Sequence, residues 1–215
     1  MLNIKQFVFN PFDENTYIVS DADSGEAIVV DPGMSNEAEN SRFDKYVADN
    51  HLKITEVVLT HMHLDHCFGA NHIQSRYGAP IAASAADAIL GVSIAGQAAR
   101  FGIYMPESEA VRASIDLTDG DIVKFGAESL QVLAVPGHSC GGIALYSRAG
   151  KVVFTGDSLF RRSIGRTDLP GGNHNELIDS VRSHLLTLPP DTLVLPGHGP
   201  STTIGEELLG NPFVV

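Results

Sequence analysis

Three histidines and an aspartate lie within six residues of one another, and their side chains are the nitrogen and oxygen ligands that zinc, iron and manganese prefer. They are His61, His63, Asp65 and His66. On an extended backbone alternate side chains share a face, so His61 and His63 point the same way, whereas Asp65 and His66 come where we expect a helix to begin. The spacing therefore indicates two metal ions, with two of these residues on each. A polar surface turn would explain a single histidine, but it explains this cluster poorly.

The elements that must position this motif are short strands. An apolar strand is predicted over 54–60, and the motif lies at its carboxyl end, where sites in layered α/β proteins collect. Three later strands, predicted over 130–135, 152–155 and 192–195, also end in polar residues beside glycine. These residues are His138, Asp157 and His198. Taken singly, each histidine is better explained as a surface residue, but together with the motif their number fits two catalytic metals.

The first part of the chain has the pattern of a strand meander. Apolar or β-branched runs over 4–9, 16–19 and 27–30 alternate with turn residues. Asp31-Pro32-Gly33 follows the third run, and two interpretations of Asp31 stand equally: it forms a turn, or it orients a metal-bound histidine. Ser35 or Asn36 is expected to cap a helix that extends to about His51.

The remaining elements suggest two halves of similar order, and hence two sheets packed face to face with helices outside. The segment 84–113 is predicted to be helical and loop material that covers a site, and 158–173 is predicted to be a loop. Further elements are predicted as a helix over 69–77, a strand over 80–83, strands from Ile115 onward with a hairpin around Gly126, a strand over 143–146 and a helix over 174–188.

Composition favours a small-molecule enzyme. The chain has 215 residues and a formal net charge of −12, without a cluster of Lys and Arg, so we expect neither nucleic-acid nor membrane binding. Its two cysteines, Cys67 and Cys140, form no CxxC motif and indicate a reducing compartment. No apolar run reaches the roughly 18 residues of a membrane span, and the N-terminus lacks the features of a signal peptide. We therefore expect a cytoplasmic protein, whose oligomeric state is left open.

In order and spacing, the segments THMHLDH, PGHS, TGD and PGHG resemble the hallmark of the metallo-β-lactamase superfamily, over nearly the whole chain. The resemblance implies an α/β fold, a four-layer αβ/βα sandwich of two mixed β-sheets, formed by 1–215 as a single domain. It implies that one metal is bound by His61, His63 and His138, and the other by Asp65, His66 and His198. Asp157 would bridge the two ions.

Within the superfamily, the segments FTGDSLF, GRTD and the residues after His198 look like glyoxalase II and its shorter relatives, the hydroxyacylglutathione-hydrolase-like proteins. Full-length glyoxalase II continues into a C-terminal helical region that helps to hold glutathione, which we do not expect here. The resemblance implies hydrolysis of an acyl thioester by a metal-bridging hydroxide, with Asp65 or Asp157 carrying the proton. Zinc is the favoured metal, with iron and manganese as alternatives.

Arg166 is the candidate substrate contact, although an ion pair with Asp168 within the same loop explains it slightly better. The main alternative function is that of a persulfide dioxygenase, which shares the fold and a GRTD-like segment but resembles a mononuclear iron site. Hydrolysis of a lactone or another ester on the same fold is a further alternative, because fold does not fix substrate. A non-catalytic metal-binding protein is disfavoured by the complete set of ligands.

Overall fold

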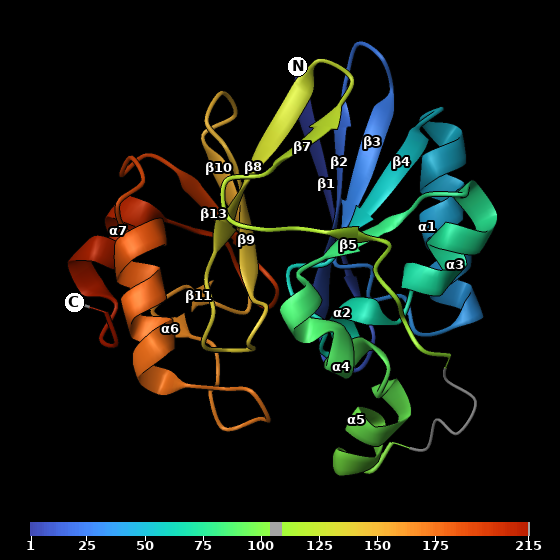
Figure 1. Ribbon diagram of the computed structural model, residues 1–215. Helices are drawn as coiled ribbons and strands as arrows, with labels where there is room; N and C mark the ends of the chain where they lie inside the picture. Colours follow the sequence, from blue (N-terminus) through green and yellow to red (C-terminus); the bar gives the residue numbers. More distant parts are fainter. Residues whose placement is uncertain (104–108, 215) are drawn as a thin grey trace. The chain divides into compact units, whose positions relative to one another are not determined.

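The computed structural model describes residues 1–103 and 109–214. The chain divides into two compact units: unit 1 comprises Met1–Asp116 with Phe125–Glu128, and unit 2 comprises Leu117–Lys124 with Ser129–Val215. One six-stranded sheet has the order β1-β2-β3-β4-β5-β6, and the other has the order β14-β13-β10-β9-β8-β7 (Figure 1). Both sheets combine parallel and antiparallel pairs, so the predicted class of two mixed sheets with helices is confirmed.

The strands of unit 1 start as a meander and continue as a parallel sheet. As predicted, β1, β2 and β3 pair antiparallel, and β3 to β6 then pair parallel. Parallel strands end at the same sheet edge, which is where the histidine motif emerges. The strands are β1 (Leu2–Phe9), β2 (Glu14–Asp21), β3 (Glu26–Val30), β4 (Lys53–Val58), β5 (Ile81–Ala83) and β6 (Ile115–Asp116).

The helices of unit 1 are short apart from the first, and their ends follow the predicted signals. Asn36 caps α1 by accepting a hydrogen bond from the Glu39 backbone amide, and Gly78 ends α3 in the left-handed conformation. Segment 84–113 holds three short helical pieces, while Met105 and Pro106 lie outside the described residues. The helices are α1 (Glu37–Asp49), α2 (Leu64–Cys67), α3 (Ala70–Tyr77), η1 (Ala85–Asp87), α4 (Ala88–Gly91) and α5 (Ile94–Arg100).

The core of unit 1 lies between its sheet and the neighbouring helices α1 and α3 (Figure 1). Phe43 and Val47, predicted as the inner face of α1, are buried there with Ile73 of α3. At the rim of this contact, Asp44 of α1 accepts a hydrogen bond from the Tyr77 hydroxyl at 2.7 Å. Together with burial, this bond raises the pKa of Tyr77 to about 12.

The sheet that lies largely in unit 2 contains the second parallel pair that matters for the site. Strands β10 and β13 run parallel, and the rest of the described ladder is antiparallel. The segment predicted as a loop, 158–173, contains a two-stranded hairpin. The strands are β7 (Ile122–Phe125), β8 (Glu128–Ala134), β9 (Ile143–Ser147), β10 (Val152–Gly156), β11 (Leu159–Phe160), β12 (Ser163–Ile164), β13 (Leu193–Pro196) and β14 (Thr202–Thr203).

The helix predicted over 174–188 is present but changes its hydrogen bonding midway. It is α-helical over α6 (His174–Ser180) and continues as the π-helical turn η2 (Val181–Leu185). Leu177, Val181 and Leu185 are buried, as predicted for its inner face, and pack on the unit 2 core. The last helix, α7 (Ile204–Gly210; Figure 1), was not predicted from the sequence, and its Ile204 belongs to the same core cluster as Leu177 of α6.

A buried carboxylate fastens α7 to the β11–β12 hairpin. Glu207 is fully buried and accepts hydrogen bonds from the Thr202 hydroxyl at 2.6 Å, the Arg162 amide at 2.8 Å and the Asn211 side chain at 2.8 Å. Three donors satisfy a carboxyl group that would otherwise be costly to bury. The residues after His198 are therefore an integral part of the unit 2 structure.

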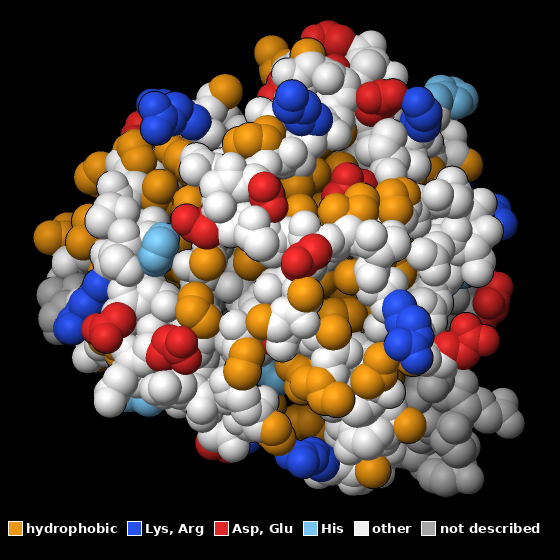
Figure 2. Space-filling model, in the orientation of Figure 1, with side chains coloured by type: hydrophobic (Ala, Val, Ile, Leu, Met, Phe, Trp, Pro, Cys, Tyr) orange, Lys and Arg blue, Asp and Glu red, His pale blue; other side chains and the backbone are white. Residues whose placement is uncertain are grey.

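The distribution of surface charge and the length of the helices bear on binding to nucleic acid and to membranes. On the face drawn in Figure 2, Lys and Arg side chains lie apart from one another among acidic and uncharged side chains. Among the described residues, no helix combines the length and apolar character needed to cross a membrane.

Candidate metal centre

The ligand candidates of unit 1 lie where two parallel strands end together. Val30, the last residue of β3, is paired with Val58, the last of β4. Asp31 follows β3 and donates its amide to the Val58 carbonyl at 3.1 Å, and Thr60 follows β4. The predicted helix at the end of the motif is present as α2, which carries Asp65 and His66.

The carboxylate of Asp31 orients two of the histidines, His66 directly and His61 through Thr60. It accepts hydrogen bonds from the Thr60 amide at 2.7 Å and the Thr60 hydroxyl at 2.6 Å, and it lies 3.0 Å from Nδ1 of His66. An ionised carboxylate only accepts, so Nδ1 of His66 carries the hydrogen and Nε2 keeps its lone pair. The interpretation of Asp31 as an orienting residue is therefore the one that its contacts support.

The same logic extends to His61 through Thr60. The Thr60 hydroxyl gives its hydrogen to Asp31, so its oxygen can accept one from Nδ1 of His61, which lies 3.1 Å away. His61 is thus also held with Nε2 as the ligand atom. Its ring packs edge-on against His63 at a centroid distance of 4.8 Å and lies 4.1 Å from the ring of His66.

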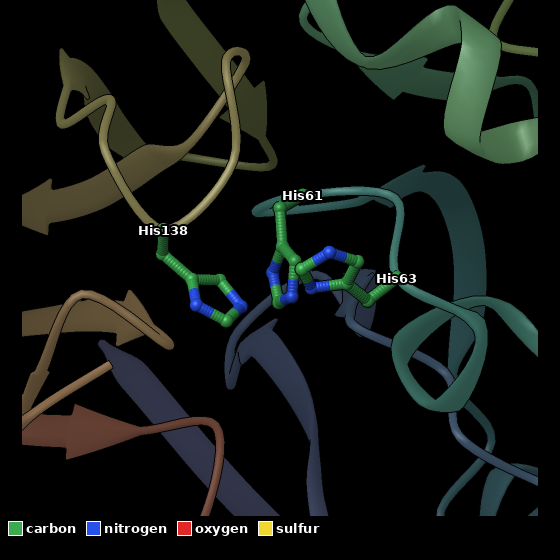
Figure 3. Close-up of side chains that lie close together, drawn as sticks. All are labelled: His61, His63 and His138. Carbon is green, nitrogen blue, oxygen red and sulfur yellow. The ribbon is translucent and has the colours of Figure 1, made fainter. Parts of the chain in front are cut away.

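The candidate ligands of unit 1 converge in a buried setting, with His61, His63, Asp65 and His66 all less than a tenth exposed. Figure 3 shows the rings of His61 and His63 turned toward each other on the loop that follows β4, and it also draws His138, which follows β8. The backbone is extended at His63 and helical from Leu64 onward, so Asp65 and His66 belong to the first turn of α2.

The donor chemistry of unit 1 fits a divalent metal. Nε2 of His66 lies 3.7 Å from Oδ2 of Asp65, too far for a hydrogen bond. Two atoms that both ligate one tetrahedral zinc lie about 3.3 Å apart, given bonds of about 2.0–2.1 Å. Asp31 also has a carboxylate oxygen within 4.8 Å of ligand atoms of His61 and His66, but its oxygens already accept the hydrogen bonds described above. We therefore assign it the orienting role.

Unit 2 presents its candidates from the loops after β8, β10 and β13. Gly156, at the end of β10, is paired with Pro196 at the end of parallel β13, so Asp157 and His198 leave the same sheet edge. His138 follows Gly137, whose φ of +126° requires glycine. A side chain at Gly137 would also collide with the backbone of Leu177 in α6.

Asp157 lies between the two histidines of unit 2. Its Oδ2 is 3.6 Å from Nε2 of His138 and 3.7 Å from Nε2 of His198, separations that again suit ligands of shared ions better than hydrogen bonds. Nδ1 of His138 lies 2.7 Å from the carbonyl oxygen of Arg166, which can only accept. His138 therefore also offers Nε2 as its ligand atom.

Arg166 contributes its backbone to this group, whereas its side chain is engaged elsewhere. The guanidinium donates to both oxygens of Asp168 at 2.7 Å, and this pair lowers the pKa of Asp168 to about 2. The ion pair that the sequence suggested is therefore present. The carbonyl of Arg166 that orients His138 had no signal in the sequence, because any residue type supplies a carbonyl.

Other residues that support unit 1 were also missed. The Asn10 amide donates to the carbonyls of Gly33 and Asp65, at 2.9 and 3.0 Å, and so fixes the backbone of a candidate ligand. Glu14 is fully buried next to this contact and accepts from the Thr16 hydroxyl at 2.8 Å. Burial raises the pKa of Glu14 well above its ordinary value. Nothing in the residue types alone connects positions so distant in the chain.

The two cysteines, for which the sequence assigned no role, differ in environment. Cys67 is buried in α2, and its burial raises the pKa of its thiol well above the ordinary value. Cys140 is exposed, with its sulfur 3.5 Å from the Gly171 carbonyl oxygen. Both are free thiols.

Two mixed sheets, with histidine and carboxylate side chains gathered where their strands end, are typical of a metal-dependent enzyme. The chain belongs to the metallo-beta-lactamase superfamily, whose family model matches residues 9–198. It is 36% identical over 215 residues to the Haemophilus influenzae protein named hydroxyacylglutathione hydrolase GloC, covering 99% of this chain and 98% of that one. This similarity agrees with a glyoxalase II-like member of the superfamily.

Solved structures resemble the chain over nearly its full length. The BLEG-1 B3 metallo-beta-lactamase has a TM-score of 0.89 at 32% identity and covers 99% of this chain and 100% of its own. ETHE1 from Myxococcus xanthus has a TM-score of 0.81 at 32% identity, covering 99% and 84%. TTHA1623, solved in a di-iron-bound form, has a TM-score of 0.85 at 35% identity, covering 97% and 99%. These names span more than one kind of activity, so the similarity alone does not choose the substrate.

Proposed function

We propose that this protein hydrolyses an acyl thioester and uses two divalent metal ions to do so. The proposal rests on membership of the superfamily and on the relative named hydroxyacylglutathione hydrolase, which matches this chain along 98% of its length. In this proposal, His61, His63 and His138 would hold one ion, Asp65, His66 and His198 would hold the other, and Asp157 would serve both.

One observation carries the proposal: three histidines are held in the same tautomer by fixed oxygen atoms. His66 is oriented by Asp31, His61 by the Thr60 hydroxyl and His138 by the carbonyl of Arg166. In each case Nδ1 carries the hydrogen and Nε2 is left as a metal ligand. Metal-binding histidines commonly have this arrangement, and here three candidate ligands share it.

When bound, two divalent cations lower the pKa of a water molecule toward neutrality and polarise an acyl carbonyl. The residues of the chain do the rest. Asp157, with its Oδ2 between His138 and His198, offsets part of the cationic charge, and Oδ2 of Asp65 is placed beside His66 to accept a proton from the attacking water. A C–O bond forms, the C–S bond breaks, and the thiol leaves as a thiolate. Because a thiol has a pKa near 8.5, its departure needs little acid assistance.

Glutathione is a reasonable carrier of the acyl group. We did not expect the helical region through which full-length glyoxalase II holds glutathione, yet the relative named for this substrate has nearly the same length as this chain. Arg166 remains the proposed substrate contact. To bind a substrate carboxylate, the Arg166 guanidinium would have to break its ion pair with Asp168. Both side chains are more than half exposed, so this ion pair can open.

The test uses metal-free protein loaded separately with Zn²⁺, Fe²⁺ and Mn²⁺ and assayed with lactoylglutathione, an acyl-homoserine lactone and a cephalosporin. We expect metal-dependent release of thiol from the thioester, with a kcat/KM well above the values for the other two substrates. If kcat/KM is highest for the cephalosporin or for the lactone, the thioester assignment is refuted, but the assignment as a metal-dependent hydrolase stands.

The second candidate is a mononuclear iron persulfide dioxygenase, which the Gly165-Arg166-Thr167-Asp168 segment keeps under consideration. Iron has to be tested in any case, because TTHA1623 was solved with two iron ions. After anaerobic purification, one iron per chain together with oxygen uptake that depends on glutathione persulfide would replace the thioesterase proposal. Two metal ions per chain and no oxygen uptake would exclude the dioxygenase.

A further inference from the structure

Two side chains of the 84–113 segment hold the backbone on both sides of His63. The Asp87 carboxylate, in η1, accepts a hydrogen bond from the Met62 amide at 3.1 Å. The Gln97 side chain, in α5, donates to the Met62 carbonyl at 3.1 Å and accepts from the Leu64 amide at 3.1 Å. Three backbone groups that flank one candidate metal ligand are thus bound by side chains from a different part of unit 1.

The bond to Leu64 satisfies the first backbone amide of a short helix. Leu64 is the first residue of α2, and the amides of a first turn have no partner within the helix. An N-cap side chain usually accepts from the second or third helical amide, and His63, at the N-cap position of α2, makes no such bond. The amide oxygen of Gln97 supplies an acceptor for the Leu64 amide, directly after the candidate ligand His63.

Gln97 and Asp87 are themselves held rigidly. Gln97 is 9% exposed, and its second amide hydrogen is donated to the Leu90 carbonyl at 2.9 Å. Asp87 is 1% exposed. The Met62 side chain is also enclosed, because a Cβ at Gly91 of α4 would collide with it. The loop is therefore fixed through both the backbone and the side chain of Met62, the residue that precedes His63.

We propose that Gln97 and Asp87 are positioning residues for the metal centre, which set the direction of the His63 imidazole by fixing the peptide groups before and after it. This inference rests on the proposed function for the role of His63 as a ligand. It assigns a function to η1 and α5, which the sequence suggested only as part of a segment expected to cover a site. Residues of this kind, which orient ligands without touching the metal, typically change metal affinity by about 10–100-fold when they are lost.

The test compares Gln97→Met, which keeps the length of the side chain but removes its three hydrogen bonds, with Gln74→Met on the exposed face of α3 as the control. Metal-free proteins are titrated with Zn²⁺ against a chromophoric chelator, the visible spectrum of the Co²⁺-loaded form is recorded, and the melting of the metal-free form is followed. We expect Gln97→Met to bind one of two Zn²⁺ equivalents about 10–100-fold more weakly and to change the Co²⁺ spectrum, and Gln74→Met to behave like the wild type.

A second pair of variants decides the matter should Gln97→Met fail to fold. Asp87→Asn keeps an acceptor for the Met62 amide and should bind Zn²⁺ with wild-type affinity. Asp87→Ala removes that acceptor and should bind Zn²⁺ more weakly. Variants that melt at lower temperature but bind both Zn²⁺ equivalents with wild-type affinity and a wild-type Co²⁺ spectrum would show a merely structural role and overturn the inference. A wild-type protein that binds two ions but cleaves no thioester would instead overturn the proposed function alone.

Discussion

Replacing Asp31 by asparagine tests the idea that one carboxylate sets the ligand atoms of two histidines. The backbone amide of Thr60 cannot move, so the new amide oxygen must stay where it accepts that hydrogen, 2.7 Å away. The new NH₂ group then takes the place of Oδ2 and faces the hydroxyl of Thr60 and Nδ1 of His66. To avoid two hydrogens meeting, His66 must move its hydrogen to Nε2, which removes the ligand lone pair. The Thr60 hydroxyl, which now accepts from the new NH₂ group, turns its own hydrogen toward Nδ1 of His61, so His61 must also carry its hydrogen on Nε2.

The expected effect is on metal binding rather than on folding. Loss of an orienting partner typically costs about 10–100-fold in metal affinity, which is about 1.4–2.7 kcal/mol at 1.36 kcal/mol per decade. Asp31 has a φ of +50°, a conformation that asparagine also tolerates, so the substitution adds little backbone strain. The matched control is Asp13→Asn, since Asp13 has a φ of +54° but is exposed.

The assay is titration of metal-free protein with Zn²⁺ in competition with a chromophoric chelator, alongside kcat/KM for lactoylglutathione. Asp31→Asn should lose affinity and activity together, and Asp13→Asn should lose neither. Unchanged affinity of Asp31→Asn for two Zn²⁺ equivalents would refute the reasoning that the tautomers of the histidines depend on this carboxylate.

Three further predictions concern unit 2. Asp157→Ala should lose one of two bound metals and most hydrolysis, measured by metal analysis and thiol release; full activity with two metals bound would contradict its shared role. Gly137→Ala should lower the free energy of unfolding by about 2 kcal/mol or more, because backbone strain adds to the collision of the new Cβ with Leu177. The control Gly120→Ala, at a φ of +86° with open space around it, should lower it by about 1 kcal/mol through backbone strain alone. Denaturant titrations that give the two variants equal stability would refute this. Arg166→Ala should raise the pKa of Asp168 from about 2 toward its ordinary 3.8, so the stability that their ion pair adds near neutral pH, which the wild type loses as pH falls toward 2, should be absent from the variant; NMR titration of the carboxyl and unfolding at several pH values test both points.

The sequence was most informative where a local signal sufficed. Asn36 caps α1 and Gly78 ends α3 because capping depends on the type of a single residue. The strands before the candidate ligands were also found, since apolar runs bounded by glycine and proline identify them. The sequence placed Asp157 and His198 at strand ends, and the parallel pairing of β10 with β13, which the structure shows, brings those two ends to one edge.

The remaining features depend on contacts that residue types do not reveal. Gln97 reaches backbone groups more than thirty positions earlier, and backbone groups are present at every residue, so no pattern marks the partner. The β11–β12 hairpin and β14 have only two residues per strand, too few for an alternation to be visible. The π-helical turn in the helix predicted over 174–188 leaves the apolar spacing almost unchanged, so that helix was predicted without it.

The placement of the candidate ligands at the carboxyl ends of parallel strands has a practical consequence for engineering the protein. Asp157 leaves the carboxyl end of β10, whereas the exposed turn 148–151 enters that strand at its amino end, a full strand length away. The turn 22–25 stands in the same relation to β3 and Asp31. Insertions at exposed turns are the ones that folds tolerate best. These two turns are therefore the places to introduce a fluorophore, an affinity tag or an immobilisation linker, because a change there leaves the ligand-bearing edge of each sheet undisturbed.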